Sequence, residues 1–175
     1  MAFALEMYFD GGADAAVRRI WALLESRGVA SAGSGPVANA RPHVTLCVFD
    51  SAPMDSVERV VSAPASELQN LSIVLSSLGF FKTAESVAFL GVTPTERLLR
   101  VQRTVATEVQ SIAVGYWNYY RPGTFVPHCT LASNVCDFAA TIDAVTTAPL
   151  PISATIASVG VIEIPSGRVQ FDIAV

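Results

Sequence analysis

The sequence predicts an α+β protein built from two similar halves, each with the order strand, helix, strand, helix, strand. Three observations support this. The string Pro-His-x-Thr-Leu occurs twice, at 42–46 and 127–131, with its histidines 85 residues apart. Helix-type and strand-type periodicities follow the same order around both copies. No Pro/Gly-rich linker divides the chain, so we expect one domain over 1–175, with repeats of about 1–82 and 83–175.

Seven strands are expected from alternating apolar residues and from enrichment in β-branched and aromatic side chains. They cover residues 3–9, 43–49, 71–80, 86–92, 127–132, 153–164 and 168–174. Val169, Phe171 and Ile173, for example, recur at every second residue, which places them on one face of a strand. Strand pairs separated by helices favour antiparallel or mixed sheets covered on one face. We therefore expect a bilobal molecule with a central cleft and outer helices, in which the lobes are free to exchange strands.

Four helices are expected from apolar residues at helical spacing. They cover residues 13–27, 54–68, 95–114 and 137–147. Thr95, or Thr93 two residues earlier, is suited to cap the third helix. Two irregular segments, 28–42 and 115–126, lead into the two copies of the repeated string. Loops of this kind commonly supply the rim of a site.

The composition is that of an ordered globular protein, with 51% hydrophobic and 15% charged residues. A net charge of −4 argues against binding of long nucleic acid, because that affinity comes from clustered lysines and arginines. The sequence shows no signal-peptide pattern and no segment that could span a bilayer, so we expect a cytoplasmic protein. We also expect it to be a monomer. Cys47, Cys129 and Cys136 lack metal-type spacing and are expected to be buried and reduced.

The repeated string has a geometry suited to phosphate chemistry. In a strand, residues two positions apart point to the same face, so His43 lies beside Thr45 and His128 beside Thr130. If the two strands meet, one imidazole can act as base, the other as acid, and the hydroxyls can bind the phosphate oxygens. A single His-x-Thr is ordinarily a structural feature of a strand, but the pair favours a shared site. No metal or other cofactor is expected, because two histidines without nearby ligands form a weak metal-binding set.

Six further residues are candidate substrate contacts: Arg41, Phe81, Lys82, Tyr119, Tyr120 and Arg121. The cationic side chains either neutralise a phosphate or lie solvated on the surface, and solvation is the more common case for the lysine. The tyrosines, together with Tyr116 and Trp117, either stack on a nucleobase or close a lobe as a hydrophobic cluster.

Two further expectations concern the strands. Phe80 and Phe81 alternate along a strand, so one is expected in the core and the other toward the cleft. Glu6 and Glu163 are expected on the surface.

The paired strings, their spacing and the duplicated layout resemble the two-histidine (2H) phosphoesterase superfamily. The closest branch is that of the 2′-5′ RNA ligase-like and RNA 2′,3′-cyclic phosphodiesterase proteins. Segments 78–81, 87–92 and 125–132 are also similar to patterns of this family, and the resemblance covers nearly the full chain.

The resemblance implies metal-independent hydrolysis of a 2′,3′-cyclic phosphate to a 2′-phosphomonoester. His43 and His128 match the catalytic histidines, with His43 favoured as the acid, and Thr45 and Thr130 match the phosphate-binding hydroxyls. Ser133-Asn134 follows the second motif without a cation, which favours a small cyclic phosphate, a nucleotide or an RNA end over polymeric RNA. A non-catalytic module that binds nucleotides or RNA ends in the same cleft, and 2′-5′ ligation, remain as alternatives.

Overall fold

The computed structural model describes residues 1–37, 39–63 and 65–175, and it has the α+β architecture that the sequence predicts. Strands and helices alternate along most of the chain. The strands are β1 (Ala2–Phe9), β2 (His43–Phe49), β3 (Ser72–Phe81), β4 (Val87–Val92), β5 (His128–Ala132), β6 (Ile152–Ile164) and β7 (Arg168–Ala174). The helices are α1 (Gly11–Ser26), α2 (Met54–Ser62), α3 (Ala65–Leu68), α4 (Glu96–Ile112) and α5 (Phe138–Thr146). Two short 3₁₀ helices, Ala32–Ser34 and Asn118–Tyr120, lie in the segments that lead into β2 and β5.

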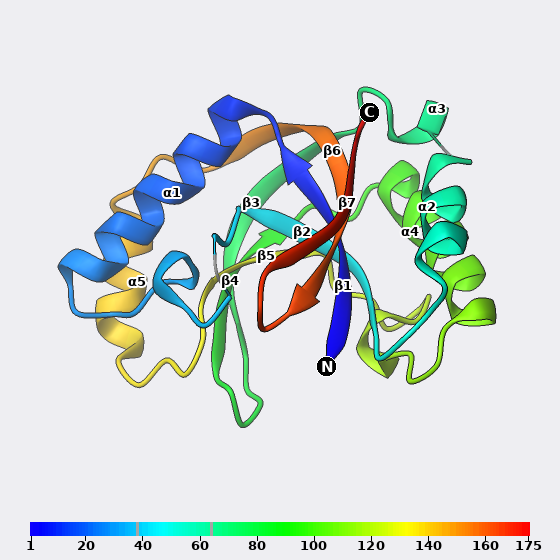
Figure 1. Cartoon of the computed structure of the whole chain (residues 1–175). Coiled ribbons are helices and arrows are strands. Elements are labelled where there is room, and N and C mark those ends of the chain that lie inside the picture. The colour runs from blue at the N-terminus through cyan, green and yellow to red at the C-terminus, as the bar shows by residue number, and fades with distance from the viewer. Residues whose placement is uncertain (38, 64) are drawn as a thin grey trace.

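All seven strands belong to one antiparallel sheet with the order β2-β1-β6-β3-β4-β5, and β7 pairs with β6 beside this path. β6 is long enough to serve both parts of the sheet. Its first residues pair with β3, and its later residues pair with β1 and β7. The sheet is strongly curved, and β2 and β5, which end the strand order, lie against each other (Figure 1). The curvature therefore brings the two histidine strands together.

The strand order is symmetrical when β1 is exchanged with β4, β2 with β5 and β6 with β3. β3, from the first half of the chain, pairs with β4, while β6, from the second half, pairs with β1. Strands from the two halves of the chain are thus interleaved in the sheet, and the division into two repeats at about residue 82 stays a prediction.

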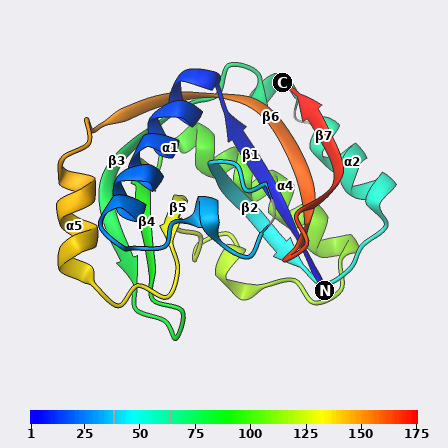
Figure 2. The same cartoon turned by 60° about the vertical axis from the view of Figure 1, so that its left-hand side comes forward.

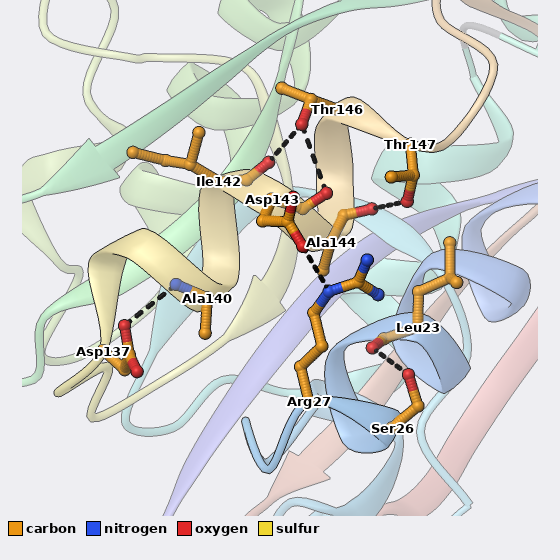
Figure 3. Close-up of polar contacts among 10 residues, drawn as sticks. All are labelled: Leu23, Ser26, Arg27, Asp137, Ala140, Ile142, Asp143, Ala144, Thr146 and Thr147. Atoms are coloured by element: carbon orange, nitrogen blue, oxygen red, sulfur yellow. Dashed lines mark hydrogen bonds and ion pairs between the residues drawn. The ribbon is translucent and has the colours of Figure 1, made fainter.

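The helices form two groups outside the curved sheet (Figures 1 and 2). α1 packs against α5 at one end, and α2 packs against α4 at the other. An ion pair of 2.6 Å between Arg27 Nε and Asp143 Oδ2 joins α1 to α5 (Figure 3). No helix in the described ranges is long and apolar enough to cross a membrane.

Side-chain caps mark the starts of α1, α4 and α5. Asp10 accepts hydrogen bonds from the backbone N–H groups of Gly12 and Ala13 at the start of α1. Thr95 Oγ1 accepts from the N–H of Leu98, which identifies Thr95 rather than Thr93 as the cap of α4. Asp137 caps α5 in the same way (Figure 3). Each cap satisfies a backbone donor that the helix itself leaves unpaired.

The prediction of one continuous helix over 54–68 is wrong, because α2 ends at Ser62 and α3 begins at Ala65. Residue 64, between them, lies outside the described residues. The sequence has a proline at this position, which has no backbone N–H to continue a helical hydrogen-bond ladder.

The alternation expected in the histidine strands is present. Val44, Leu46 and Leu131 are fully buried behind the sheet. Cys129 is also buried, and burial raises the pKa of its thiol to about 12, so it stays protonated. The expectation of burial is wrong for Cys136, which lies on the surface beyond β5.

Candidate active site

His43 and His128 make the same hydrogen bond. Nδ1 of His43 lies 2.7 Å from the carbonyl oxygen of Arg41, and Nδ1 of His128 lies 2.7 Å from that of Val126. A carbonyl oxygen only accepts, so Nδ1 carries the hydrogen in both rings. Nε2 is therefore the nitrogen available for proton exchange in each imidazole. The proline of the repeated string explains the geometry, because it holds the residue before it in an extended conformation.

The strands next to β2 and β5 place different side chains beside the two His-x-Thr motifs. In the pairing of β1 with β2, Glu6 stands opposite Thr45 and Tyr8 opposite His43. In the pairing of β4 with β5, Phe89 stands opposite Thr130 and Gly91 opposite His128. A bulge lies next to Glu6 in the first pairing and next to Phe89 in the second. The registers are thus equivalent, while the side chains are not.

A buried carboxylate lies beside His43. Glu6 is 4% exposed, and its Oε1 lies 3.4 Å from His43 Nε2, which makes an ion pair when the imidazole is protonated. Tyr8 donates its hydroxyl hydrogen to Glu6 Oε2 at 2.9 Å. The expectation that Glu6 is a surface residue is wrong, because its carboxylate is buried beside Tyr8 and His43 at the lining of the second cavity.

The ring of Tyr8 packs against the charged pair of Arg41 and Asp172. The Arg41 guanidinium lies over the Tyr8 ring at 3.7 Å from its centroid and forms a 2.8 Å ion pair with Asp172 of β7. Burial, followed by the nearby Glu6 carboxylate, raises the pKa of the Tyr8 hydroxyl. Tyr8 therefore remains a hydrogen-bond donor to Glu6 across the physiological pH range.

The surroundings of His128 are aromatic. The rings of Phe81 and Phe89 stack on each other at 4.2 Å and meet the His128 ring edge-on at 4.8 and 5.3 Å. Burial lowers the pKa of His128 below its usual value of 6.5. The hydrogen bond to the Val126 carbonyl opposes this shift, and the proximity of His43 adds to it. His128 is therefore neutral at neutral pH, and the effect of His43 on its titration reflects the closeness of the two rings.

Two adjoining cavities open at the histidines, with volumes of about 500 and 520 Å³. His128 lines the first cavity, while His43 and Thr45 line the second. Four residues line both cavities: Trp117, Tyr120, Thr130 and Ser133. The structure thus brings the four residues of the two His-x-Thr motifs to one continuous hollow.

The segment between α4 and β5 is anchored next to the threonines. Gln102, which is buried, donates to the carbonyl oxygens of Leu46 and Tyr120 at 3.3 and 2.7 Å. The Tyr116 hydroxyl donates to the same Tyr120 carbonyl at 2.9 Å. Burial raises the pKa of the Tyr120 hydroxyl to about 12, and an interaction with the Thr45 hydroxyl partly opposes that shift. Tyr120 is therefore anchored through its backbone carbonyl, and its side chain lines both cavities.

The other expected contacts divide into two groups. Phe81, Tyr119 and Tyr120 line the first cavity, and Arg41 lines the second. Lys82 and Arg121 are exposed and line neither cavity.

Among the aromatic residues of 115–126, the stacking interpretation fits two side chains. Tyr119 and Trp117 are 73% and 41% exposed at the cavity edge. Tyr116 packs instead against the core. Phe81 faces the site, while Phe80 packs on Phe138 of α5 at 5.1 Å. The alternation expected for the two phenylalanines is therefore present.

Sequence reasoning missed Glu6, Tyr8 and Ser133 as residues of the site. A signal existed for Glu6, since a carboxylate inside an otherwise apolar strand needs a buried partner. In the described part of the chain, no group of three or more His, Cys, Asp or Glu side chains is arranged to hold a metal ion.

The curved antiparallel sheet and the two facing His-x-Thr strands define the class of the two-histidine phosphoesterases. A family model described as the 2′-5′ RNA ligase superfamily matches residues 10–168. The chain therefore belongs to the 2′-5′ RNA ligase superfamily, which confirms the family that the motifs indicate. No curated protein matches the chain by sequence.

Solved structures share the fold at low sequence identity. E. coli LigT in its apo form is 16% identical with a TM-score of 0.60, over 99% of this chain and 94% of LigT. The Thermus thermophilus protein TT0787 is 15% identical with a TM-score of 0.57, over 99% and 97% of the two chains. Kluyveromyces marxianus Usb1 with uridine monophosphate is 14% identical with a TM-score of 0.50, over 99% and 97%. At these identities, the likeness establishes the fold alone.

Proposed function

We propose that this protein hydrolyses a 2′,3′-cyclic phosphate of a small nucleotide or an RNA end to a 2′-phosphomonoester. The observation that carries the proposal is the matched hydrogen bond of His43 and His128, which engages Nδ1 in both rings and so leaves Nε2 as the nitrogen that exchanges a proton beside Thr45 and Thr130. Membership of a superfamily of phosphoesterases supports the same reaction class.

In the proposed reaction, His128 is the general base and His43 the general acid. His128, neutral because of its burial, takes a proton from water while the water oxygen bonds to phosphorus. The bond between phosphorus and O3′ breaks, and His43 gives its proton to O3′. One proton is gained by His128 and one is lost by His43, so the protons balance and the two rings exchange protonation states.

In this proposal, the threonine hydroxyls bind the phosphate. Thr45 and Thr130 project from the same strand faces as the histidines, and Thr130 lines both cavities. Hydroxyls in this position donate to the non-bridging oxygens, where negative charge must be held as the fifth bond to phosphorus forms. In this proposal the chemistry uses only side chains of the chain itself.

The charges of the hollow favour a small substrate with a single phosphate. Among the described residues that line the two cavities, Arg41 is the one lysine or arginine, and it is already paired with Asp172. Glu6, Glu85 and Asp172 add three carboxylates to the same lining. A polyanion would meet more repulsion than attraction there. Trp117 and Tyr119 offer a stacking surface for a nucleobase.

The test is a panel of 2′,3′-cyclic nucleotides, ADP-ribose cyclic phosphate and short RNA with a cyclic end, assayed with and without EDTA. We expect hydrolysis of the mononucleotides that EDTA does not inhibit and a 2′-phosphomonoester as the product. Saturable binding without turnover would instead identify a binding module. Turnover that EDTA abolishes would contradict the proposed mechanism.

A further inference from the structure

The two halves of the site share one backbone frame but differ in the side chain next to the histidine. Glu6 stands opposite Thr45, and Phe89 stands at the equivalent position opposite Thr130. A carboxylate in one repeat therefore takes the place of a phenyl ring in the other. Two identical imidazoles are given opposite surroundings, one charged and one apolar.

Both oxygens of Glu6 are held. Oε2 accepts the Tyr8 hydroxyl at 2.9 Å, and Oε1 lies 3.4 Å from His43 Nε2. A buried carboxylate is costly unless it is paired, because removal from water penalises the charge. Of these two partners, only His43 can supply a compensating positive charge, and it does so only when protonated.

The other ionisable groups around His43 do not provide an alternative partner for Glu6. The charge of Arg41 is engaged by Asp172 of β7. Tyr8 and Tyr120 stay neutral, because burial raises the pKa of both hydroxyls. His128, on β5, is neutral when it serves as the base. The Cys129 thiol also remains protonated, because burial raises its pKa to about 12.

We infer that Glu6 is a positioning residue that holds His43 in its protonated form and so assigns the acid role to His43 and the base role to His128. This inference rests on the proposed function. The assignment follows from the asymmetry between Glu6 and Phe89, since the two motifs alone are interchangeable.

The contact of Glu6 is with the reacting nitrogen of His43. Nδ1 is already bonded to the Arg41 carbonyl, so the carboxylate faces the proton that must be delivered. At 3.4 Å the contact is longer than the 2.7–2.9 Å typical of a charge-assisted hydrogen bond. The proton is thus stabilised without being locked, and the leaving oxygen of a bound substrate can replace Glu6 as its acceptor.

Glu6→Gln tests the inference because it removes the charge and keeps the shape. We expect kcat to fall by about tenfold or more, with KM changed by less than about threefold. The alkaline limb of the pH–rate profile should move to lower pH by about one unit, because the acid loses the carboxylate that retains its proton. Glu6→Asp keeps the charge, so its alkaline limb should lie closer to that of the unmodified protein than the limb of Glu6→Gln does. An unchanged limb and kcat in Glu6→Gln would overturn the inference.

Glu163→Gln is the matched control. Glu163 lies on β6, pairs with Arg168 and lines neither cavity, so its neutralisation should leave kcat and the pH profile unchanged. A shift of the alkaline limb in this variant equal to that in Glu6→Gln would overturn the inference, because it would indicate a general charge effect.

A second measurement separates this inference from the proposed function. NMR titration of the two imidazoles needs no substrate. In the unmodified protein, His128 should lose its proton at lower pH than His43. Glu6→Gln should narrow the gap, which is the difference between the pH values at which the two imidazoles titrate. If the gap narrows while no cyclic phosphate is hydrolysed, the proposed function fails and the effect of Glu6 on protonation stands. A gap that does not respond to Glu6→Gln would overturn the inference, whatever the activity.

Discussion

The rings of His43 and His128 are oriented by the same local contact, an Nδ1–H···O=C hydrogen bond of 2.7 Å to the residue two positions earlier. The Pro-His string builds this contact within three residues, before any tertiary structure is considered. The fold then adds what the string cannot supply, which is the meeting of β2 and β5 across the curved sheet.

Replacement of either histidine should remove most of the activity. We expect His43→Ala and His128→Ala each to lower kcat by about 10²- to 10⁴-fold, because each removes one proton-transfer group. Both rings are only partly buried, so the melting temperature should change little. Steady-state kinetics and thermal melts of the two variants test this, and a variant with near-normal kcat would contradict the proposed mechanism.

The acidic limb of the pH–rate profile should report on His128. As the pH falls, the base gains a proton and stops accepting one from water, so kcat/KM declines. Because burial lowers the pKa of His128, the decline should be centred below pH 6.5. Phe81→Ala opens the ring to water and should move the limb up toward pH 6.5. An unchanged limb in this variant would argue against His128 as the base.

The threonine hydroxyls should contribute mainly to the transition state. Thr130→Val keeps the shape of the side chain and removes its donor, so we expect kcat to fall by about 10- to 100-fold. Thr45→Val makes the same change in the other motif, and we expect a similar loss of kcat. Steady-state kinetics of the two variants test this. Thr93→Val, at an exposed contact with Ser76, serves as the control.

Extra negative charge on the substrate should weaken its binding. A 2′,3′-cyclic nucleotide that also carries a 5′-phosphate should have a KM about tenfold higher than the unphosphorylated form, because three carboxylates and one paired arginine line the hollow. The difference should shrink as salt is added, since added ions screen the repulsion. Equal KM values at low salt would contradict this description of the hollow.

The wall behind His128 should be sensitive to one added methyl group. A Cβ at Gly79 would stand 2.6 Å from Cε2 of Phe89, so Gly79→Ala must displace that ring. We expect a loss of stability of about 1–3 kcal/mol from overpacking. The acidic limb should shift as well, because Phe89 meets His128 edge-on. Gly11→Ala, where a Cβ would have no neighbour within 4 Å, should stay within about 0.5 kcal/mol of the original protein.

The sequence was sufficient for the fold class and for most of the elements. The seven strands lie within two residues of their predicted limits, because strict alternation marks both the face and the length of a strand. The helix over 54–68 was not divided correctly, since the apolar spacing continues past the proline. The proline was the local signal for the break, because it has no backbone N–H to continue the helical hydrogen-bond ladder.

The sequence predicted the four motif residues of the site but not the neighbours of the two imidazoles, because those neighbours depend on the register between strands. The placement of His43 beside Thr45, and of His128 beside Thr130, on one face of a strand follows from the repeated local pattern. The environment of each ring depends on which residue of the neighbouring strand lies opposite it, and a bulge beside Glu6 sets that pairing. A one-residue slip would turn Glu6 to the other face, so the local pattern alone could not connect it with His43.

The long strand β6 determines what happens when the chain is divided into two fragments. Because β6 pairs with β1 on one side and β3 on the other, a cut at the boundary near residue 82 would leave each fragment with an unpaired strand edge. Neither piece should be soluble and folded alone. Expressed together, the two pieces should pair again along β6 and fold into one domain.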